Sequence, residues 1–393
     1  MSAVSEMTWD VCVVGGGPAG ATAAHELSLR GRSVALLDRA GRIKPCGGAV
    51  PTRLLRDFEI PDHLLVARVT RARMVSPRTR MVDMRIDGGF VGMVDRDTFD
   101  EWLRERARGA GAVRVRAELR AIERAPDGDY RLECRAQGAT FKLRARTVIG
   151  ADGAASLVAR QCMPQAAAKA RYVAAYHEIV AAPASIAADR CEVHYCGELS
   201  PDFYGWVFPH GGVVSVGVGS ARRGFSLRHA TQRLRQATGL DGARTVRREG
   251  APIPMKPLPR WDDGHGVVLA GDAAGVVAPA SGEGIYYAMY GGQLAAEAVE
   301  QRLASGEAGS LRSARRRFMR EHGRVFWVLG MMQWFWYRSD RRRERFVSLC
   351  EDPDIQRLTW QAYLEKRLVR ARPGAHARIF FKDLAHLLGL APL

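Results

Sequence analysis

The order of apolar positions near the N-terminus predicts a strand, a turn, a helix and a second strand over residues 9–38. Val11–Val14 form a continuous apolar run, which is typical of a strand buried on both faces. Residues 19–29 are rich in helix-forming side chains, and 34–37 form a second apolar run. The chain is therefore expected to begin with a βαβ unit.

Further apolar runs predict a chain that alternates between strands and helices. Strands are expected at 66–75, 81–86, 113–124, 130–135, 146–151, 172–180, 190–195, 205–208, 213–218 and 267–270. Helices are expected at 97–108, with Asp97 as N-cap, at 226–237, at 282–303 and throughout the chain after 305.

Composition indicates a globular protein with a basic surface. Of the 393 residues, 47% are apolar and 26% charged, and the net charge is +17. This charge indicates an anionic partner, or it reflects the codon usage of a GC-rich genome, because only six of the 59 basic residues are Lys. The seven Cys form no CxxC pair and the N-terminus has no signal-peptide pattern, so a reduced compartment is expected.

A glycine pattern lies between the first strand and the first helix. Gly15, Gly17 and Gly20 fit G-x-G-x-x-G, and Asp38 ends the second strand. The first glycine permits a tight turn, the second lets the backbone approach a pyrophosphate, and the third lets helix and strand pack closely. The acid binds a ribose hydroxyl and disfavours a 2′-phosphate. The pattern therefore predicts a bound dinucleotide, FAD or NAD.

Two later segments indicate which of these two dinucleotides is bound. Residues 148–153 (VIGADG), followed by Ser156 and Arg160, and residues 268–275 (VLAGDAAG) resemble the second and third fingerprints of para-hydroxybenzoate hydroxylase-like flavoproteins. The resemblance implies FAD, with Asp272 at the ribityl chain and Arg96 reaching the cofactor.

With this assignment, the sequence predicts an α/β fold with an α+β insertion. A Rossmann-type FAD domain is expected from 1–65, 95–170 and 262–304. A β-sheet substrate domain is expected from 66–94 and 171–261, and a helical C-terminal region from 305–393.

Two further motifs indicate which family of these flavoproteins the chain resembles. Residues 44–51 read KPCGGAVP, and residues 204–209 read YGWVFP, followed by Gly217-Val-Gly219. Both are similar to the geranylgeranyl reductase family, in the branch that acts on geranylgeranyl diphosphate or geranylgeranyl-bacteriochlorophyll in phototrophic bacteria. The resemblance implies an FAD-dependent enzyme that saturates three isolated double bonds of the chain to give phytyl, with NADPH or another donor supplying the electrons.

The resemblance also assigns residues to a cofactor site. It implies FAD contacts from Gly15, Gly17, Ala19, Gly20, Asp38, Arg39, Cys46, Gly47, Gly48, Arg96, Leu119, Asp152, Gly271, Asp272, Gly284 and Ile285. No second glycine motif of this kind lies between a strand and a helix, so a nicotinamide donor is expected to dock without a domain of its own.

Two groups of side chains are candidates for the chemistry of reduction. Cys46 either donates a proton or tunes the flavin, or it is a small buried residue, as free Cys often is. Tyr204, Trp206 and Phe208 share one face of a strand and either line an isoprenoid pocket or form an ordinary β core. The CEVHYC segment, 191–196, is not expected to bind a metal, because its two thiols would face opposite sides of a strand.

The C-terminal region concentrates the positive charge. Residues 312–346 hold 11 Arg against 3 acids and include the 13-residue apolar run 325–337, which as a helix is about 20 Å long and too short to span a bilayer. This segment either lies at a lipid headgroup boundary, covers the substrate pocket, or forms a protein interface. Nucleic-acid binding fits poorly, because the aromatic side chains form one apolar block.

The expected setting is the cytoplasmic side of a membrane, with peripheral association and a pigment-esterifying synthase as partner. Two other functions stay open at this point. One is a flavin monooxygenase or halogenase of the same fold, although the WxWxIP motif of the halogenases is replaced here by YGWVFP. The other is a non-catalytic, flavin-bearing membrane assembly factor.

Overall fold

The computed structural model describes residues 7–39 and 44–367, and the chain divides into two compact units. Of the described residues, the first unit contains 7–39, 44, 96–172 and 252–323. The second contains 45–95, 173–251 and 324–367. Residues 45–65, which the sequence assigns to the nucleotide domain, thus fall in the second unit.

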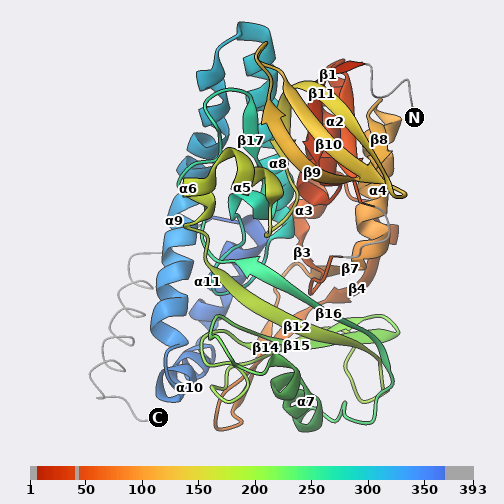
Figure 1. The fold of residues 1–393 in the computed structure, drawn as a ribbon. Coiled ribbons are helices and arrows are strands. Elements are labelled where there is room, and N and C mark those ends of the chain that lie inside the picture. Colours follow the sequence, from red (N-terminus) through yellow and green to blue (C-terminus); the bar gives the residue numbers. More distant parts are fainter. Residues whose placement is uncertain (1–6, 40–43, 368–393) are drawn as a thin grey trace. The chain divides into compact units, whose positions relative to one another are not determined.

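A seven-stranded sheet forms the centre of the first unit (Figure 1). Five of its strands are parallel, in the order β8 (Val113–Arg116), β2 (Val34–Asp38), β1 (Thr8–Val14), β11 (Ala139–Gly150) and β17 (Val267–Leu269). The first half of β11 also pairs with antiparallel β10 (Tyr130–Ala136), which pairs with β9 (Glu118–Arg124). The carboxyl ends of the parallel strands meet at one edge, where ligands bind in open α/β sheets.

Three helices of the first unit pack against one another beside this sheet. α2 (Pro18–Leu29) contacts both α4 (Arg96–Gly109) and α8 (Ile285–Ser305). The approach of α8 to α2 requires a glycine, because a Cβ on Gly292 would lie 2.2 Å from the carbonyl oxygen of Ala19. The unit is completed by α5 (Leu157–Cys162), α6 (Pro164–Ala167) and the 3₁₀ turns Gly271–Ala274 and Ala308–Leu311.

The start of α4 differs from the prediction in one detail. The helix begins at Arg96, so Asp97 lies in its first turn and is not the N-cap. The capping prediction was wrong because Arg96, which precedes the acid, already has helical geometry. An acid in the first turn still interacts favourably with the helix dipole.

The second unit contains two sheets. The larger has the order β16 (Thr245–Pro254), β12 (Tyr172–Ala181), β15 (Val213–Ser220), β14 (Gly205–His210), β13 (Arg190–His194), β5 (Arg71–Val75) and β6 (Met81–Arg85). The smaller has the order β3 (Ala49–Pro51), β7 (Val91–Val94) and β4 (Leu65–Val69). Helix α3 (Thr52–Asp57) and the 3₁₀ turn Asp62–Leu64 connect β3 to β4.

The two faces of the larger sheet differ. α7 (Leu227–Ala237) covers one face, where its Ala230 and Leu234 pack with Val207, Val216 and Val218 in a buried cluster (Figure 1). Residues of β14 and β15 that alternate with these valines, such as Trp206 and Ser215, project from the other face. The sheet thus carries its apolar core on one side and a row of aromatic and polar side chains on the other.

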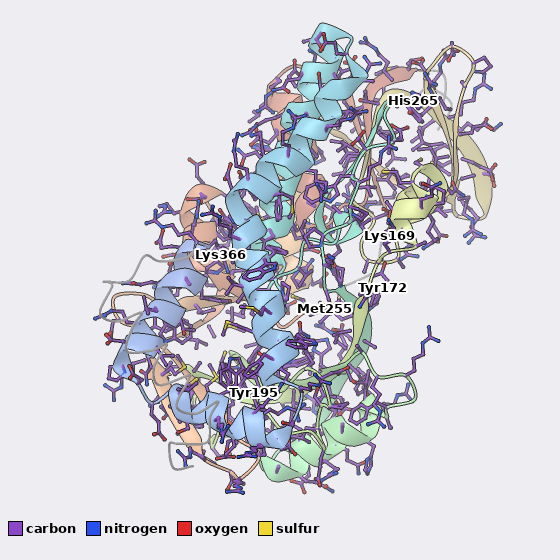
Figure 2. The ribbon with its side chains drawn as sticks, turned by 90° about the vertical axis from the view of Figure 1, so that its left-hand side faces the viewer. Lys169, Tyr172, Tyr195, Met255, His265 and Lys366 are labelled. Atoms are coloured by element: carbon purple, nitrogen blue, oxygen red, sulfur yellow. The ribbon has the colours of Figure 1, made fainter. Side chains whose placement is uncertain are left out.

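The last described helices are α9 (Arg312–Trp336), α10 (Asp340–Leu349) and α11 (Pro353–Glu365). The division between the units falls at Gly323, inside α9. Tyr195, labelled in Figure 2, packs against Tyr337, which directly follows α9, and against Phe346 of α10, with ring centroids 5.2 and 5.1 Å apart. Among the described residues, the helices are all too short or too polar to cross a bilayer. The predicted α/β class, with a β-rich second part and a helical C-terminal region, is confirmed.

Candidate functional site

The glycine turn after β1 has the geometry that a phosphate group requires. Gly15 has a φ of +108°, and a Cβ there would lie 2.3 Å from the carbonyl oxygen of Ala151. A Cβ on Gly20 would lie 1.8 Å from the carbonyl oxygen of Gly15, so this glycine brings α2 against the turn. At Gly17, the N-cap of α2, a Cβ would meet nothing within 4 Å. The turn is therefore closed by its first and third glycines and open at its second, at a helix N-terminus.

Asp38 lies beside this turn at the end of β2 and is buried. Its Oδ2 forms ion pairs with Arg104, at 3.5 Å, and with Arg114, at 3.3 Å. Arg104 also donates a hydrogen bond to the carbonyl oxygen of Gly16, at 3.2 Å. The sequence analysis missed both arginines, since the contacts join α4 and β8 to a residue more than 60 positions earlier. The two cations thus hold the Asp38 side chain in place beside the turn.

Asp272 of the third fingerprint lies next to the first. Its side chain is 7% exposed and forms an ion pair with Lys44 Nζ at 2.5 Å. The preceding Gly271, with a φ of +62°, would place a Cβ 2.8 Å from the Cβ of Ala19 in the first turn of α2. A Cβ on Gly284 would lie 3.8 Å from Asp272 Oδ1. The first unit thus brings together all three predicted fingerprints, since Gly15 also approaches Ala151 of the second, and it adds Lys44, the first residue of the KPCGGAVP motif, which was not assigned to the cofactor site.

The side chain of Asp152, in the second fingerprint, forms hydrogen bonds within the protein. Its carboxylate accepts hydrogen bonds from Ser156 Oγ at 2.5 Å and from the backbone N–H groups of Leu157 and Val158 at 2.6 and 3.2 Å. Burial raises the pKa of Asp152, and these hydrogen bonds partly offset that rise. Ser156 is the N-cap of α5 and accepts from the backbone N–H of Ala159. Asp152 and Ser156 therefore fasten the start of α5 after β11.

The remaining residues that the resemblance assigns to the cofactor differ in burial and in their partners. Arg96 is buried and donates two parallel hydrogen bonds to Asp100, at 2.8 and 2.7 Å. Leu119 is buried on β9 opposite Cys134. Arg39 is half exposed and pairs with Glu118 at 3.3 Å, while Ile285 begins α8.

In the second unit, Cys46 lies in a turn pressed against β14 and β7. A Cβ on Gly47 would lie 3.0 Å from Phe208 Cδ2. Gly48 has a φ of +69°, and a Cβ there would lie 2.5 Å from the carbonyl oxygen of Val94 and 2.6 Å from His210 Nε2. The Cys46 thiol accepts a hydrogen bond from the backbone N–H of Gly48 at 3.4 Å. The two glycines are thus what lets the Cys46 turn approach the aromatic strand.

The predicted aromatic face is a continuous row of rings. The centroid of Trp206 lies 6.2 Å from that of Tyr204 and 6.4 Å from that of Phe208. The GVG segment makes room for Trp206 and for Phe203, whose ring stacks on Tyr204, because a Cβ on Gly217 would lie 2.6 Å from Trp206 Cζ2 and one on Gly219 2.7 Å from Phe203 Cδ1. The second unit therefore brings the Cys46 turn and the aromatic row together.

A stripe of exposed side chains runs along α9 and continues just past its end. Trp327, Met331 and Trp334 are 67%, 46% and 64% exposed and follow one another at helical spacing. Exposed arginines continue the same spacing on both sides, namely Arg320, Arg324 and Arg338. The opposite side of the helix is buried at Val325 and Phe326. We call the residues 320, 324, 327, 331, 334 and 338 the α9 stripe.

These features define an FAD-binding flavoprotein, and comparison with known proteins agrees. The chain matches the FAD binding domain family over residues 8–310. It is 56% identical to the geranylgeranyl diphosphate reductase of Rhodobacter capsulatus, over 98% of this chain and 99% of that protein. It is 34% identical to the enzyme of the same name from Synechocystis, over 98% and 100%. The chain therefore belongs to the geranylgeranyl diphosphate reductase family of FAD-binding proteins.

Solved structures share this fold. A geranylgeranyl bacteriochlorophyll reductase-like protein from Thermoplasma acidophilum matches 92% of this chain and 98% of its own, with a TM-score of 0.82 and 23% identity. The flavin-dependent brominase Bmp2 matches with a TM-score of 0.73 and 16% identity. At these identities the likeness concerns the fold alone.

Proposed function

We propose that this protein is an FAD-dependent reductase that saturates the three isolated double bonds of a geranylgeranyl chain. The observation that carries the proposal is the 56% identity to the Rhodobacter capsulatus reductase along almost the whole of both chains. The first unit is proposed as the FAD domain and the second as the substrate domain. NADPH is proposed as the electron donor.

The residues of the first unit fit FAD. The open position at Gly17 and the N-terminus of α2 suit the pyrophosphate, Asp38 suits the adenosine ribose, and Asp272 suits the ribityl hydroxyls. Once bound and reduced by the electron donor, FAD would supply the hydride that an unactivated alkene must receive. Lys44 forms an ion pair with Asp272, and the carboxylate oxygens can also accept hydrogen bonds from hydroxyl groups.

The residues of the second unit suit an apolar substrate. An isolated alkene develops no oxyanion, so the protein acts by positioning the chain, excluding water and placing an acid. The rings of Tyr204, Trp206 and Phe208 offer an extended apolar surface for a twenty-carbon chain. We propose Cys46 as the proton donor, since its turn lies against Phe208 in the same unit.

We further propose that the protein binds peripherally to the cytoplasmic side of a membrane through the α9 stripe. The stripe has an apolar centre with Trp at both ends and Arg on both flanks, which is the pattern of a helix at an anionic headgroup boundary. At a membrane surface the protein would have access to a hydrophobic substrate and to a pigment-esterifying synthase.

An anaerobic assay of the full chain with NADPH tests the activity. Geranylgeranyl diphosphate and geranylgeranyl-bacteriochlorophyll are supplied separately, and the products are analysed by mass spectrometry. We expect masses that rise in steps of two hydrogens, up to three steps, with one or both substrates. A gain of one oxygen in a parallel assay in air, with no product under anaerobic conditions, would instead support a monooxygenase, and a flavin that NADPH never reduces would exclude this donor.

A further inference from the structure

A row of three residues crosses the larger sheet of the second unit at Trp206. Gly217 of β15 is paired in register with His177 of β12 on one side and with Trp206 of β14 on the other. Residues paired in this way project from the same face. A Cβ on Gly217 would lie 2.4 Å from the Cβ of His177 and 2.6 Å from Trp206 Cζ2. Glycine is therefore required for the imidazole and the indole to meet above this strand.

Ser215, two residues before Gly217 on the same face, connects the two rings. The indole Nε1–H of Trp206 donates to Ser215 Oγ at 3.1 Å, and Ser215 Oγ lies 2.9 Å from His177 Nδ1. His177 Nε2 lies 3.0 Å from Glu249 Oε2, and Glu249 Oε1 pairs with Arg247 at 2.5 Å. Ser215 and His177 are both buried. A polar chain thus runs from the indole to an ion pair on β16.

The donors and acceptors fix the direction of this chain. An indole N–H can only donate, so Ser215 accepts from Trp206, and the Glu249 carboxylate beside Nε2 favours the imidazole tautomer whose Nδ1 accepts the Ser215 hydroxyl proton. His177 then carries its proton on Nε2, which faces the Glu249 carboxylate. Glu249 Oε2 lies close to His177 Nε2 but off the axis of its N–H bond. Glu249 therefore acts on the imidazole through its charge and not through a hydrogen bond. Because Ser215 is buried and both its partners are engaged, it is not placed to act as a nucleophile.

We propose that Glu249, His177 and Ser215 are positioning residues that hold Trp206 for the isoprenoid chain. They turn the indole N–H into the sheet, so the hydrocarbon part of the ring joins Tyr204 and Phe208 in the aromatic row. Without the Ser215 hydroxyl, the N–H has to seek another acceptor and the ring loses its single orientation. This inference rests on the proposed function, in which that row contacts the geranylgeranyl chain.

The test uses the FAD-loaded full chain labelled with 5-fluorotryptophan. The ¹⁹F resonance of Trp206 is assigned from its loss in Trp206→Phe. In Ser215→Ala we expect this resonance to shift or split, and the KM for geranylgeranyl diphosphate to rise about tenfold while kcat changes less than about twofold. The matched control is Ser220→Ala on the same strand, because Ser220 is also buried but donates to Asp202 at 2.8 Å. It should leave the resonance and KM unchanged.

A second pair of variants decides the matter where Ser215→Ala does not fold. Glu249→Asp keeps a carboxylate charge on the side of His177 Nε2, whereas Glu249→Gln has nearly the size of the native side chain but removes the charge. We expect the Trp206 resonance and KM to be close to wild type in the first and displaced in the second. An unmoved resonance in folded Ser215→Ala, or equal behaviour of the two Glu249 variants, would overturn the inference. Wild-type protein that fails to reduce the substrate would refute the proposed function instead, and the resonance would still report on the polar chain.

Discussion

At the scale of single residues, the most informative contacts join charged side chains that are far apart in the sequence. Lys44 meets Asp272, and Arg114 of β8 meets Asp38 of β2. In both cases a buried or nearly buried carboxylate is paired with a cation that lies far from it in the sequence. Ionised carboxylates accept hydrogen bonds from sugar hydroxyls more strongly than neutral ones do. These ion pairs therefore hold both acids in place where we propose that FAD binds.

Asp272→Ala should remove FAD from the purified protein. The substitution deletes the acceptor proposed for the ribityl chain and leaves Lys44 without its partner. We expect less than about a tenth of the wild-type flavin absorbance per chain, a loss of at least about 1.4 kcal/mol in binding free energy. The control is Asp10→Ala, at the other end of β1 from the glycine turn, where the acid bonds to Ser33. Normal flavin content in Asp272→Ala would contradict the assignment.

Cys46→Ser should slow reduction of the substrate and leave FAD content unchanged. The hydroxyl is a much weaker acid than the thiol, so a proton donated from residue 46 arrives more slowly; general acid catalysis typically contributes about a hundredfold or more. Single-turnover oxidation of the reduced enzyme by substrate measures this step. Cys196→Ser, another partly buried thiol of the second unit, is the control. Equal rates in Cys46→Ser and wild type would remove the thiol from the mechanism.

At the scale of elements, α4 is fastened to β8 and to the nucleotide turn by one acid. Glu101 accepts from Arg114 at 2.5 Å and from Arg104 at 2.7 Å, and both arginines also reach Asp38. The hydrogen bond from Arg114, helped by Arg104, lowers the pKa of Glu101 from its ordinary 4.5 to about 2. Through Arg104 and Arg114 the helix is thus tied to Asp38 beside the glycine turn, and its attachment should depend on pH.

Glu101→Gln should lower the free energy of unfolding at pH 7. A carboxyl with a lowered pKa stabilises the fold fully above its unfolded pKa, near 4.5, and this contribution is lost as the pH falls towards about 2. Because Glu101 is 43% exposed, solvent screening limits the effect to about 1 kcal/mol. Urea unfolding at several pH values should show the difference from wild type shrinking below pH 4.5. Glu105→Gln, equally exposed on the same helix, should have a smaller effect, and a pH-independent difference would contradict this account.

At the scale of the whole molecule, the sequence predicted elements and motifs better than contacts between them. The glycine turn, the strand before Asp38 and the aromatic alternation follow from local spacing, which the backbone geometry preserves. β16 was not identified as a strand, because its segment TVRREGAPIP lacks an apolar alternation. The links of Lys44 to Asp272 and of Ser215 to Trp206 depend on tertiary packing and register. Local patterns do not encode these.

The arginines that contribute to the net charge of +17 have different roles in the structure. Arg343 is buried and donates to the carbonyl oxygens of Pro201 and Tyr337, so it holds the fold and is not available to a lipid surface. Arg342 lies over the ring of Phe335 at 4.3 Å. Arg338, at the end of the α9 stripe, and Arg341 beyond it are exposed. A test of membrane binding should therefore change these two and leave Arg343 intact.

Changing Trp327, Met331 and Trp334 to Ser should weaken binding to phosphatidylglycerol vesicles at least about tenfold, since burial of each large apolar side chain contributes about 1.5–3 kcal/mol. Arg338→Gln with Arg341→Gln should weaken binding to these vesicles, by about 1 kcal/mol per charge, and have little effect with neutral phosphatidylcholine. Vesicle co-sedimentation of the full chain measures both. The control changes three exposed apolar residues elsewhere, Leu29, Val66 and Met81, to Ser. If that control loses binding as strongly as the stripe variant, general surface hydrophobicity and not the α9 stripe carries the attachment.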